Sequence, residues 1–337
     1  MIKIGIDAMG GDFAPKEAVQ GAVLAVNKFQ DIELYLYGRE TEIKPYLTEE
    51  HDRLKVVHCE DVLPMEVKDP AQAVRRQHDA SLVRACADAK NGFIQAVVSA
   101  GATGAVIAAG TLIIRRLKEV DRPALAPIMP TIQKGKYTIL CDAGATSEGK
   151  PHYLYQNAKI ATIYAQEVLG VKNPRIGLLN IGTEASKGGE LQREAFDLIA
   201  ADKSLNFAGN IESKSMITGE VDIIATDGYS GNIAMKAVEG AASSVFKLLK
   251  QELMGSTMGK LGALLAKGVF KNIKNHMDAS SVGGAVLLGI KAPVIKAHGS
   301  SDAVAIMNAI RQARETVHQD VITKISAALQ KQATDSE

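Results

Sequence analysis

Short apolar segments, each followed by a small-residue turn and then by a helical pattern, recur along this chain of 337 residues. Helical patterns fill most of the intervals, and Pro15, Pro70 and Pro151 each stand where a first helical turn accepts proline. This alternation predicts a three-layer α/β/α fold around a mostly parallel sheet. The segments predicted to be strands are 3–7, 33–37, 54–58, 94–99, 137–142, 175–181, 206–208 and 222–226.

The alternation is not divided by a linker, so we expect one α/β catalytic domain over residues 1–330 and a flexible tail at 331–337. The stretch 91–114 carries no charge and is long enough by count to span a bilayer. Gly101 and Gly104 interrupt it between a β-branched run and a run rich in Ala, Ile and Leu. We therefore expect a strand, a turn and a buried helix there.

Charge and cysteine content exclude several classes of protein. The 39 Lys and Arg residues nearly balance the 38 Asp and Glu residues, for a formal net charge of +1, which argues against a nucleic-acid-binding surface. Cys59, Cys86 and Cys141 form no C-x-x-C pair, and the histidines show no metal-ligand spacing, so we expect neither disulfides nor a metal site. The N-terminal residues lack signal-peptide features, and we expect a cytoplasmic protein.

Small-residue loops follow five of the predicted strands. In open α/β sheets ligands bind at the carboxyl ends of the strands. Glycines there let backbone N–H groups approach an anion, and the next helix N-terminus adds partial positive charge. The five loops are therefore candidates, as a group, for binding an anionic substrate. They are residues 7–12, 99–104, 142–145, 182–184 and 226–232.

The segment 142–151 nearly matches the phosphate-binding loop G-x-x-x-x-G-K-[ST] of nucleotide hydrolases. Pro151 stands where that motif needs a hydroxyl side chain for Mg²⁺, and proline also lacks an N–H. No G-x-G-x-x-G motif follows the first strand. The sequence thus favours neither an ATPase or GTPase nor a standard dinucleotide site, and no cofactor is expected.

The segment 291–302 has a strand pattern that runs into Gly-Ser-Ser-Asp before the last long helical region. Lys296 and His298 share one face of an extended strand, and the serines can donate to an oxyanion or a phosphate. Ser301 or Asp302 is also a good helix N-cap. Capping and a functional role are compatible here.

The segment 243–277 is basic and amphipathic. It has six lysines against one acid, Glu252. At 100° per residue, apolar side chains fall on one arc and four lysines on the opposite arc. A membrane-binding helix and a helix hairpin within a dimer interface both fit this pattern. The apolar set is Met258, Leu261, Leu265, Val269 and Ile273, and the basic set is Lys260, Lys267, Lys271 and Lys274.

Four motifs together closely resemble the PlsX family, the acyl-acyl-carrier-protein:phosphate acyltransferases of bacterial phospholipid synthesis. They lie at 7–12, 121–127, 226–232 and 291–302. The resemblance implies transfer of a fatty acyl group from acyl carrier protein to inorganic phosphate, giving acyl phosphate for a membrane glycerol-3-phosphate acyltransferase. It also implies a fold similar to isocitrate and isopropylmalate dehydrogenases and phosphotransacetylase, and a homodimer that associates peripherally with membrane.

With that resemblance, the loops suggest roles for individual residues. The expected catalytic residues are Lys296, His298 and Ser300. The expected contacts to phosphate or thioester are Gly101, Thr103, Gly144, Thr183, Lys187 and Asn232. Ala102 and Thr146 stand where the family pattern has asparagine, so the expected contacts there rest on backbone groups and Thr103.

Acyl carrier protein is acidic, so a local basic docking patch is expected despite the balanced total charge. Candidates are Arg75, Arg76, Arg115, Arg116 and Lys118, while Lys260, Lys267, Lys271 and Lys274 are expected to contact membrane or a partner. Three alternatives stay open: a phosphotransacylase that uses coenzyme A, a metal- and nicotinamide-dependent oxidative decarboxylase, and a non-catalytic membrane scaffold.

Overall fold

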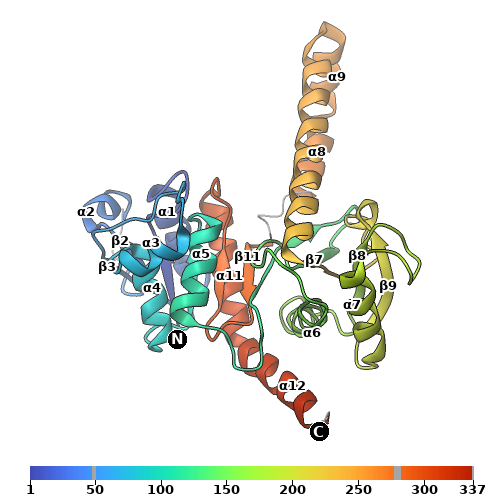
Figure 1. The fold of residues 1–337 in the computed structure, drawn as a ribbon. Coiled ribbons are helices and arrows are strands. Elements are labelled where there is room, and N and C mark those ends of the chain that lie inside the picture. The colour runs from blue at the N-terminus through green and yellow to red at the C-terminus, as the bar shows by residue number, and fades with distance from the viewer. Residues whose placement is uncertain (48–50, 277–281, 336–337) are drawn as a thin grey trace.

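The strands form two sheets in this computed structural model, which describes residues 1–47, 51–276 and 282–335 (Figure 1). The first sheet has the order β3 (Leu54–His58), β2 (Ile32–Gly38), β1 (Ile2–Asp7), β4 (Ala96–Ser99), β12 (Val294–Lys296), β11 (Ala285–Leu288) and β5 (Ala124–Ala126). The second has the order β6 (Ile128–Pro130), β7 (Tyr137–Cys141), β10 (Ile223–Ala225), β8 (Arg175–Asn180) and β9 (Asn206–Glu212).

Most neighbouring strands run parallel, as the sequence predicts. The antiparallel pairs are β12–β11, β11–β5 and β6–β7. Each of the eight predicted strands is present within a few residues of its expected bounds. The short strands β5, β6 and β11 were not among the predicted segments, and the strands divide between two sheets.

Helices cover both faces of the seven-stranded sheet. Alternate residues of β2 point to opposite faces, so that Leu34 and Leu36 lie in one buried cluster with α1 (Lys16–Lys28) and α11 (Ala303–His318). Tyr35 and Tyr37 lie in another with α4 (Ser81–Lys90) and α5 (Thr103–Ala109). This arrangement confirms the three-layer α/β/α fold.

Helices also cover both faces of the five-stranded sheet. The helices α6 (Pro151–Val168) and α7 (Glu190–Ala201) pack together on one face, and the first turns of α8 (Gly228–Met254) cover the other. The remaining helical elements are α2 (Glu40–Ile43), η1 (Lys44–Tyr46), α3 (Pro70–Arg76), η2 (Gly110–Ile114), η3 (Ser213–Ser215), α9 (Thr257–Leu265), α10 (Lys267–His276) and α12 (Val321–Asp335).

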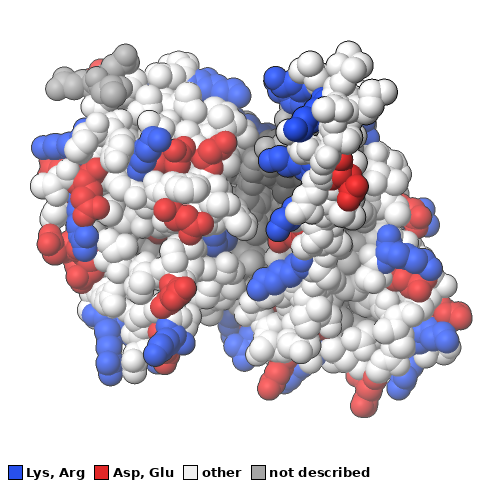
Figure 2. Space-filling view, turned by 90° about the horizontal axis from the view of Figure 1, so that it is seen from above, with Lys and Arg blue, Asp and Glu red and all other residues white. Residues whose placement is uncertain are grey.

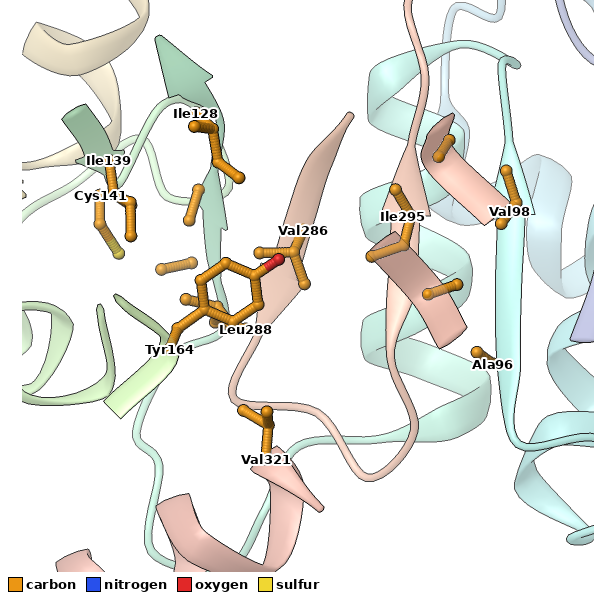
Figure 3. Packing of buried hydrophobic residues seen from close by; sticks show 14 of the residues in the cluster. Ala96, Val98, Ile128, Ile139, Cys141, Tyr164, Val286, Leu288, Ile295 and Val321 are labelled. Carbon is orange, nitrogen blue, oxygen red and sulfur yellow. The ribbon is translucent and has the colours of Figure 1, made fainter. Parts of the chain in front are cut away.

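One cluster of buried apolar side chains extends from the first sheet to the second. Figure 3 shows Val98 of β4 and Ile295 of β12 on one side, Ile139 of β7 on the other, and Val286 of β11 with Tyr164 of α6 between them. Because the core is continuous, the loops at the strand ends of both sheets are held against one another.

The local signals at helix starts are largely confirmed. Pro70 and Pro151 occupy first-turn positions, and the Asp69 side chain caps α3 by accepting from Gln72 N at 2.9 Å. The uncharged stretch forms β4, the turn and the helical pair α5–η2 as expected. At the other end α12 continues to Asp335, so the expected tail is helical up to that residue, and residues 336–337 lie outside the described part.

The helices α8 and α9 form an arm that projects from the two sheets (Figure 1). The predicted basic amphipathic helix is divided there, because α8 ends at Met254, Ser256 caps α9, and α10 starts only after Ala266. Of the side chains described within 243–276, none is buried. Met277 and the side chain of Lys274 lie outside the described residues. In the described part of the chain no helix has both the length and the apolar content needed to cross a bilayer.

Candidate active site

The predicted ligand loops of the two sheets, apart from the loop after β8, are candidates for one site at a cleft between the two lobes of the molecule. Figure 2 shows the surface deeply hollowed there, beside the arm. Loops 7–12, 99–104 and 296–301 come from the first sheet, and loops 142–149 and 226–232 from the second. Ala145 packs against the cluster that holds Ala102 and Ile107, and Ala143 N donates to Leu125 O at 2.8 Å. These contacts join the two sets of loops.

Lys296 is the last residue of β12 and is buried, with 8% of its surface exposed. Its ammonium Nζ donates to Ala100 O at 3.3 Å and to Ala297 O. Burial lowers the pKa of Lys296 to about 8, against the charges of Asp7 and Asp12, which raise it. An ammonium has three N–H donors, so one remains for an anion in the cleft.

His298 lies two residues beyond Lys296 and is exposed. Ser300 N donates to His298 Nδ1 at 3.2 Å, and Ser300 Oγ lies 2.8 Å from the same atom. Because a backbone N–H can only donate, Nδ1 is the acceptor, and the neutral ring carries its proton on Nε2. Thus His298 offers an N–H donor from Nε2, and Ser300 orients the ring instead of facing a ligand with its hydroxyl.

The helix cap that the sequence predicts in this segment is confirmed. The Asp302 side chain accepts from Ala305 N at 2.8 Å and so caps α11. Gly299 O accepts from Asp12 N at 2.8 Å, which ties the loop after β12 to the loop after β1. Ser301 is buried.

The backbone N–H of Gly101, an expected phosphate donor, is already used within the protein. It donates to Ser99 Oγ at 3.0 Å. Gly10 must be small for a related reason, since a Cβ on it would lie 2.7 Å from Gly101 N. The glycines thus let two loops approach each other closely. Gly101 N is thus paired in this conformation, and a substrate contact from the backbone around Gly101 stays a prediction.

The loop after β7 is organised by the buried carboxylate of Asp142. Oδ1 accepts from Leu125 N, Gly144 N and Ala145 N at 2.9, 3.1 and 2.9 Å. Oδ2 accepts from Thr146 N and Thr146 Oγ1, both at 2.8 Å. Burial raises the pKa of Asp142, and these hydrogen bonds lower it. The Gly144 N–H therefore binds Asp142 in this conformation, and a substrate contact from the backbone around Gly144 stays a prediction.

Asn232 lies directly beside the Gly144 loop. A Cβ on Gly144, whose φ is +126°, would lie 3.0 Å from Asn232 Nδ2. Asn232 is on the second turn of α8, whose first turn is capped by Asp227 accepting from Ser230 N at 2.8 Å. Its amide is half-buried. The structure thus brings together Gly144 and Asn232, and it leaves the Asn232 side chain as a donor at the edge of the cleft.

Thr103 and the two positions that depart from the family pattern lie at the same edge. Thr103 is the first residue of α5 and is exposed. Ala102 precedes it as the N-cap and makes no side-chain cap bond. Thr146 turns inward to Asp142. A polar contact to substrate at this edge therefore falls to Thr103.

Thr183 and Lys187 are on an exposed loop after β8. Two asparagines hold this loop: Asn180 Nδ2 donates to Lys187 O at 3.0 Å, and Asn210 Nδ2 donates to Glu184 O at 2.8 Å. Among the described residues, no hydrogen bond joins this loop to Lys296, His298 or Asn232. Thr183 and Lys187 thus lie on a separate loop, and their contact with substrate stays a prediction.

Nucleophilic cysteines and metal clusters do not contribute to this cleft. Cys86 and Cys141 are buried, and burial raises the pKa of both thiols, so they are poor nucleophiles near neutral pH. Within the described residues, no group of three His, Cys, Asp or Glu side chains is placed to hold a metal ion. The chemistry of the cleft therefore rests on positioned N–H donors and one buried ammonium.

Some of the predicted basic docking residues are exposed beside the candidate site, and one binds carbonyl oxygens of its own turn. Arg75 and Arg76 are exposed in the last turn of α3. A Cβ on Gly104, at the start of α5, would lie 2.9 Å from Pro70, so α3 borders the cleft. The Arg116 guanidinium instead binds the carbonyl oxygens of Leu117, Lys118 and Val120 and fixes a turn.

Three residues of the cleft were missed as individuals by sequence reasoning. Asp7 and Asp142 were seen only as members of small-residue loops, and Ser81 carries no signal that distinguishes it from other helix-start serines. The available signal is an aspartate placed at the last residue of a buried strand or just beyond it, directly before glycines. A buried acid at that position needs hydrogen-bond donors, and the loop supplies them.

Comparison with known proteins gives a consistent result. The chain matches the family described as "Fatty acid synthesis protein" over residues 2–324. It is 48% identical over 328 residues to a phosphate acyltransferase of Anoxybacillus flavithermus, covering 97% of this chain and 98% of that protein. It is 45% identical over 331 residues to a phosphate acyltransferase of Bacillus anthracis, covering 98% and 99%.

Solved structures of lower identity share the fold. A phosphotransacetylase from Streptococcus pyogenes aligns with a TM-score of 0.60 at 16% identity, over 93% of this chain and 94% of that chain. The EutD phosphotransacetylase from Staphylococcus aureus aligns with a TM-score of 0.59 at the same identity and coverage.

Proposed function

The chain belongs to the PlsX family of phosphate acyltransferases, and we propose that it transfers a fatty acyl group from the thioester of acyl carrier protein to inorganic phosphate. Its product is then an acyl phosphate for phospholipid synthesis. The observation that carries the reaction is the buried Lys296, which places an ammonium with one remaining donor beside loops from both lobes.

The reaction needs little from the protein beyond positioning. A phosphate oxygen attacks the thioester carbonyl carbon, the C–O bond forms, and the C–S bond breaks as its electron pair leaves with sulfur. Phosphate is itself the nucleophile, which fits a cleft without an activated Ser or Cys. Thiolate is a good leaving group, so a strong general acid is not required. The protein must hold a dianion against the carbonyl and stabilise the negative charge that develops on its oxygen.

The donors in the cleft fit those two tasks. Lys296 and Nε2–H of His298 supply a charge and a hydrogen bond within one short segment, and Asn232 and Thr103 supply donors from the other loops. One positioned donor at a developing oxyanion contributes roughly 3 kcal/mol to lowering the barrier. We assign Lys296 and His298 to the reacting carbonyl and phosphate, with Ser300 orienting His298.

Thr183 and Lys187 complete the proposal as residues of a loop that closes on substrate. The loop is exposed and is held by hydrogen bonds from Asn180 and Asn210. It follows β8 of the five-stranded sheet, and Asn232 lies on the helix that follows β10 of the same sheet. Lys187 is half-exposed, 4.0 Å from the nearest oxygen of Glu184. An ammonium held this loosely is free to reorient toward a phosphate.

The basic residues beside the cleft support acyl carrier protein as the donor of the acyl group. Arg75 and Arg76 present two exposed guanidinium groups at the end of α3, which borders the loop of Thr103. Arg115 and Lys118 are also exposed, whereas Arg116 is used within its own turn. An acidic carrier would be steered to this edge of the molecule.

We further propose that the protein works as a homodimer in the cytoplasm at the membrane surface, through its arm. Lys260, Lys267 and Lys271 are exposed on α9 and α10, and basic side chains follow one another along the arm in Figure 2. Each lysine near anionic lipid contributes about 1 kcal/mol. Association there would deliver acyl phosphate to a membrane glycerol-3-phosphate acyltransferase.

One assay tests the reaction and its donor. Purified protein is mixed with inorganic phosphate and either palmitoyl-acyl carrier protein or palmitoyl-coenzyme A, and acyl phosphate is measured. We expect the carrier-protein thioester to be the better substrate by at least tenfold in kcat/KM. Equal or faster use of palmitoyl-coenzyme A would favour a phosphotransacylase that uses coenzyme A. No acyl phosphate from either donor would contradict the proposed function.

A further inference from the structure

Three polar side chains lie in one row across neighbouring strands of the seven-stranded sheet. Asp7 of β1 pairs with Ser99 of β4, and Ser99 pairs with Lys296 of β12, in parallel register. Register partners point to the same face of a sheet, so the carboxylate, the hydroxyl and the ammonium line up on one side. Asp7 and Lys296 are 4% and 8% exposed. Two opposite charges are therefore buried two strands apart, roughly 10 Å between Cα atoms.

The hydrogen bonds of Asp7 and the charge of Lys296 favour its ionised form, whereas burial raises the pKa of this carboxyl group. Ser81 Oγ donates to Oδ1 and Ser99 Oγ donates to Oδ2, both at 2.6 Å. Ser99 Oγ also accepts from Gly101 N, so its own proton is available for Asp7. Both carboxylate oxygens thus accept hydrogen bonds. A protonated acid would have to donate to one of these hydroxyls and would leave that hydroxyl's own proton without an acceptor.

The hydrogen bonds of Lys296 fit the complementary charge. Its Nζ donates to the carbonyl oxygens of Ala100 and Ala297, neither of which can donate in return. We propose that Asp7 is a positioning residue that holds Lys296 in its ammonium form at the cleft, and that Ser81 and Ser99 fix the carboxylate that does this. The proposal rests on the proposed function for its catalytic meaning, because a neutral amine would neither attract phosphate nor stabilise an oxyanion.

The surroundings identify Asp7 as the decisive charge. Burial lowers the pKa of Lys296, and the charges of Asp7 and Asp12 raise it. Asp12 is exposed, so water and salt screen it more than they screen buried Asp7. The other titratable groups nearby are His298, which is exposed, and the Cys86 thiol of α4, whose pKa is raised by burial so that it stays neutral. Without Asp7, little would oppose the lowering of the Lys296 pKa by burial.

The direction of the expected change follows from this balance. With Asp7 in place, the pKa of Lys296 is about 8, and the ammonium is the main form at neutral pH. Removing the carboxylate charge lowers this pKa further, because less then opposes the effect of burial. The neutral amine then becomes a substantial fraction near pH 7.

The titration of Lys296 can be measured without turnover. The full-length protein is labelled briefly with an amine-selective acylating reagent at a series of pH values, and the modified fraction of Lys296 is read by mass spectrometry. Because only the neutral amine reacts, the midpoint reports the pKa. We expect a midpoint near 8 in the wild-type protein and a lower midpoint in Asp7→Asn. Asp12→Asn should move it by much less.

One further variant keeps the inference testable. Asp7→Ser removes the same charge with a smaller side chain that leaves room for water between Ser81 and Ser99, so it serves if Asp7→Asn does not fold. In either folded variant, an unchanged Lys296 midpoint overturns the inference, even if activity is lost. The labelling result is independent of whether the wild-type protein makes acyl phosphate, so it separates failure of this inference from failure of the proposed function.

The pH profile of kcat gives a second readout that a purely structural role would not move. We expect the alkaline limb of kcat to shift downward with the Lys296 midpoint in Asp7→Asn, with activity partly recovered at lower pH. Arginine stays charged throughout this range. In a Lys296→Arg background, Asp7→Asn should therefore no longer move the limb. A uniform loss of activity at every pH would contradict the inference.

Discussion

Buried carboxylates order both sides of the cleft, and they do so by accepting hydrogen bonds rather than by facing substrate. Asp142 takes three N–H donors on Oδ1 and two donors on Oδ2, which closes the loop after β7 around one side chain. Asp7 binds two serine hydroxyls on neighbouring elements. In both cases the glycines that follow allow close approach, and we propose that the donors for substrate come from Lys296, His298 and Asn232.

Removing either of the two donors at the end of β12 should slow the reaction. Lys296→Ala and His298→Ala are each expected to lower acyl-phosphate formation at least tenfold, because each takes away a charge or hydrogen bond from the developing oxyanion. Lys291→Ala is the matched control, since Lys291 is exposed and lies five residues before Lys296 on the same segment. Thermal unfolding should show all three variants folded. Near wild-type turnover in both test variants would remove this segment from the active site.

Replacing Asp142 should lower the free energy of unfolding more directly than it lowers the rate of the reaction. In Asp142→Asn the amide nitrogen must face either the Thr146 donors or the three N–H groups on the other oxygen. Donors would then oppose donors in a buried site, and we expect the free energy of unfolding to fall by about 3 kcal/mol. Urea denaturation measures the change. Asp197→Asn, on the exposed face of α7, is the control and should lie within about 0.5 kcal/mol of wild type.

At the scale of elements, patterns of adjacent residues predicted strand positions and helix starts correctly. Strand pairing between positions distant in the sequence was not predicted. β3 is found at 54–58 as predicted, and α3 starts at Pro70 behind its Asp69 cap, since a strand pattern and a cap are each encoded by a few adjacent residues. β5 is three residues long, and its strand character depends on pairing with β11, more than 150 positions away. That partner is invisible in a local pattern.

The same distinction applies to the cleft. The loops were correctly expected at the carboxyl ends of strands, since the α/β alternation fixes that position. The use of the N–H groups of Gly101 and Gly144 inside the protein depends on Ser99 and Asp142, whose side-chain directions are set by packing. Small-residue loops therefore predicted where the site is and not which donors it leaves free.

The arm's lysines should determine binding to anionic lipid. Changing Lys260, Lys267, Lys271 and Lys274 together to Glu reverses the charge of one face, and we expect binding to vesicles containing phosphatidylglycerol to be lost in a sedimentation assay. The control variant changes Lys28, Lys90, Lys172 and Lys203 to Glu, which alters the net charge equally on exposed surfaces away from the arm. If the arm variant still binds the vesicles, or if the control variant loses binding equally, the lysines of the arm are not what binds anionic lipid.

At the scale of the whole molecule, the two sheets share a core, but the arm has none of its own. Its α8 and α9 pack against each other, yet Val245, Leu248, Leu264 and Leu265 are between 58% and 81% exposed. Monomeric proteins rarely expose so much contiguous apolar surface. A cavity of about 490 Å³ also opens between α8 and the two helices that follow it. An arm built this way needs a partner surface.

A second copy of the chain is the partner that we expect for the cavity side of the arm. That side is lined by Phe246, Leu249, Leu253 and Phe270 and is predominantly apolar, whereas the lysines expected to meet lipid lie elsewhere on α9 and α10. A two-fold contact would insert apolar side chains of each arm against the other, and burying a Leu contributes about 2 kcal/mol. Leu249→Glu with Leu253→Glu should therefore convert a dimer to a monomer in sedimentation velocity. Met258→Glu, on the apolar stripe outside the cavity, is the control that should stay dimeric. A wild-type monomer, or a dimer that survives both glutamates, would place the dimer contact elsewhere and leave the cavity side for another ligand.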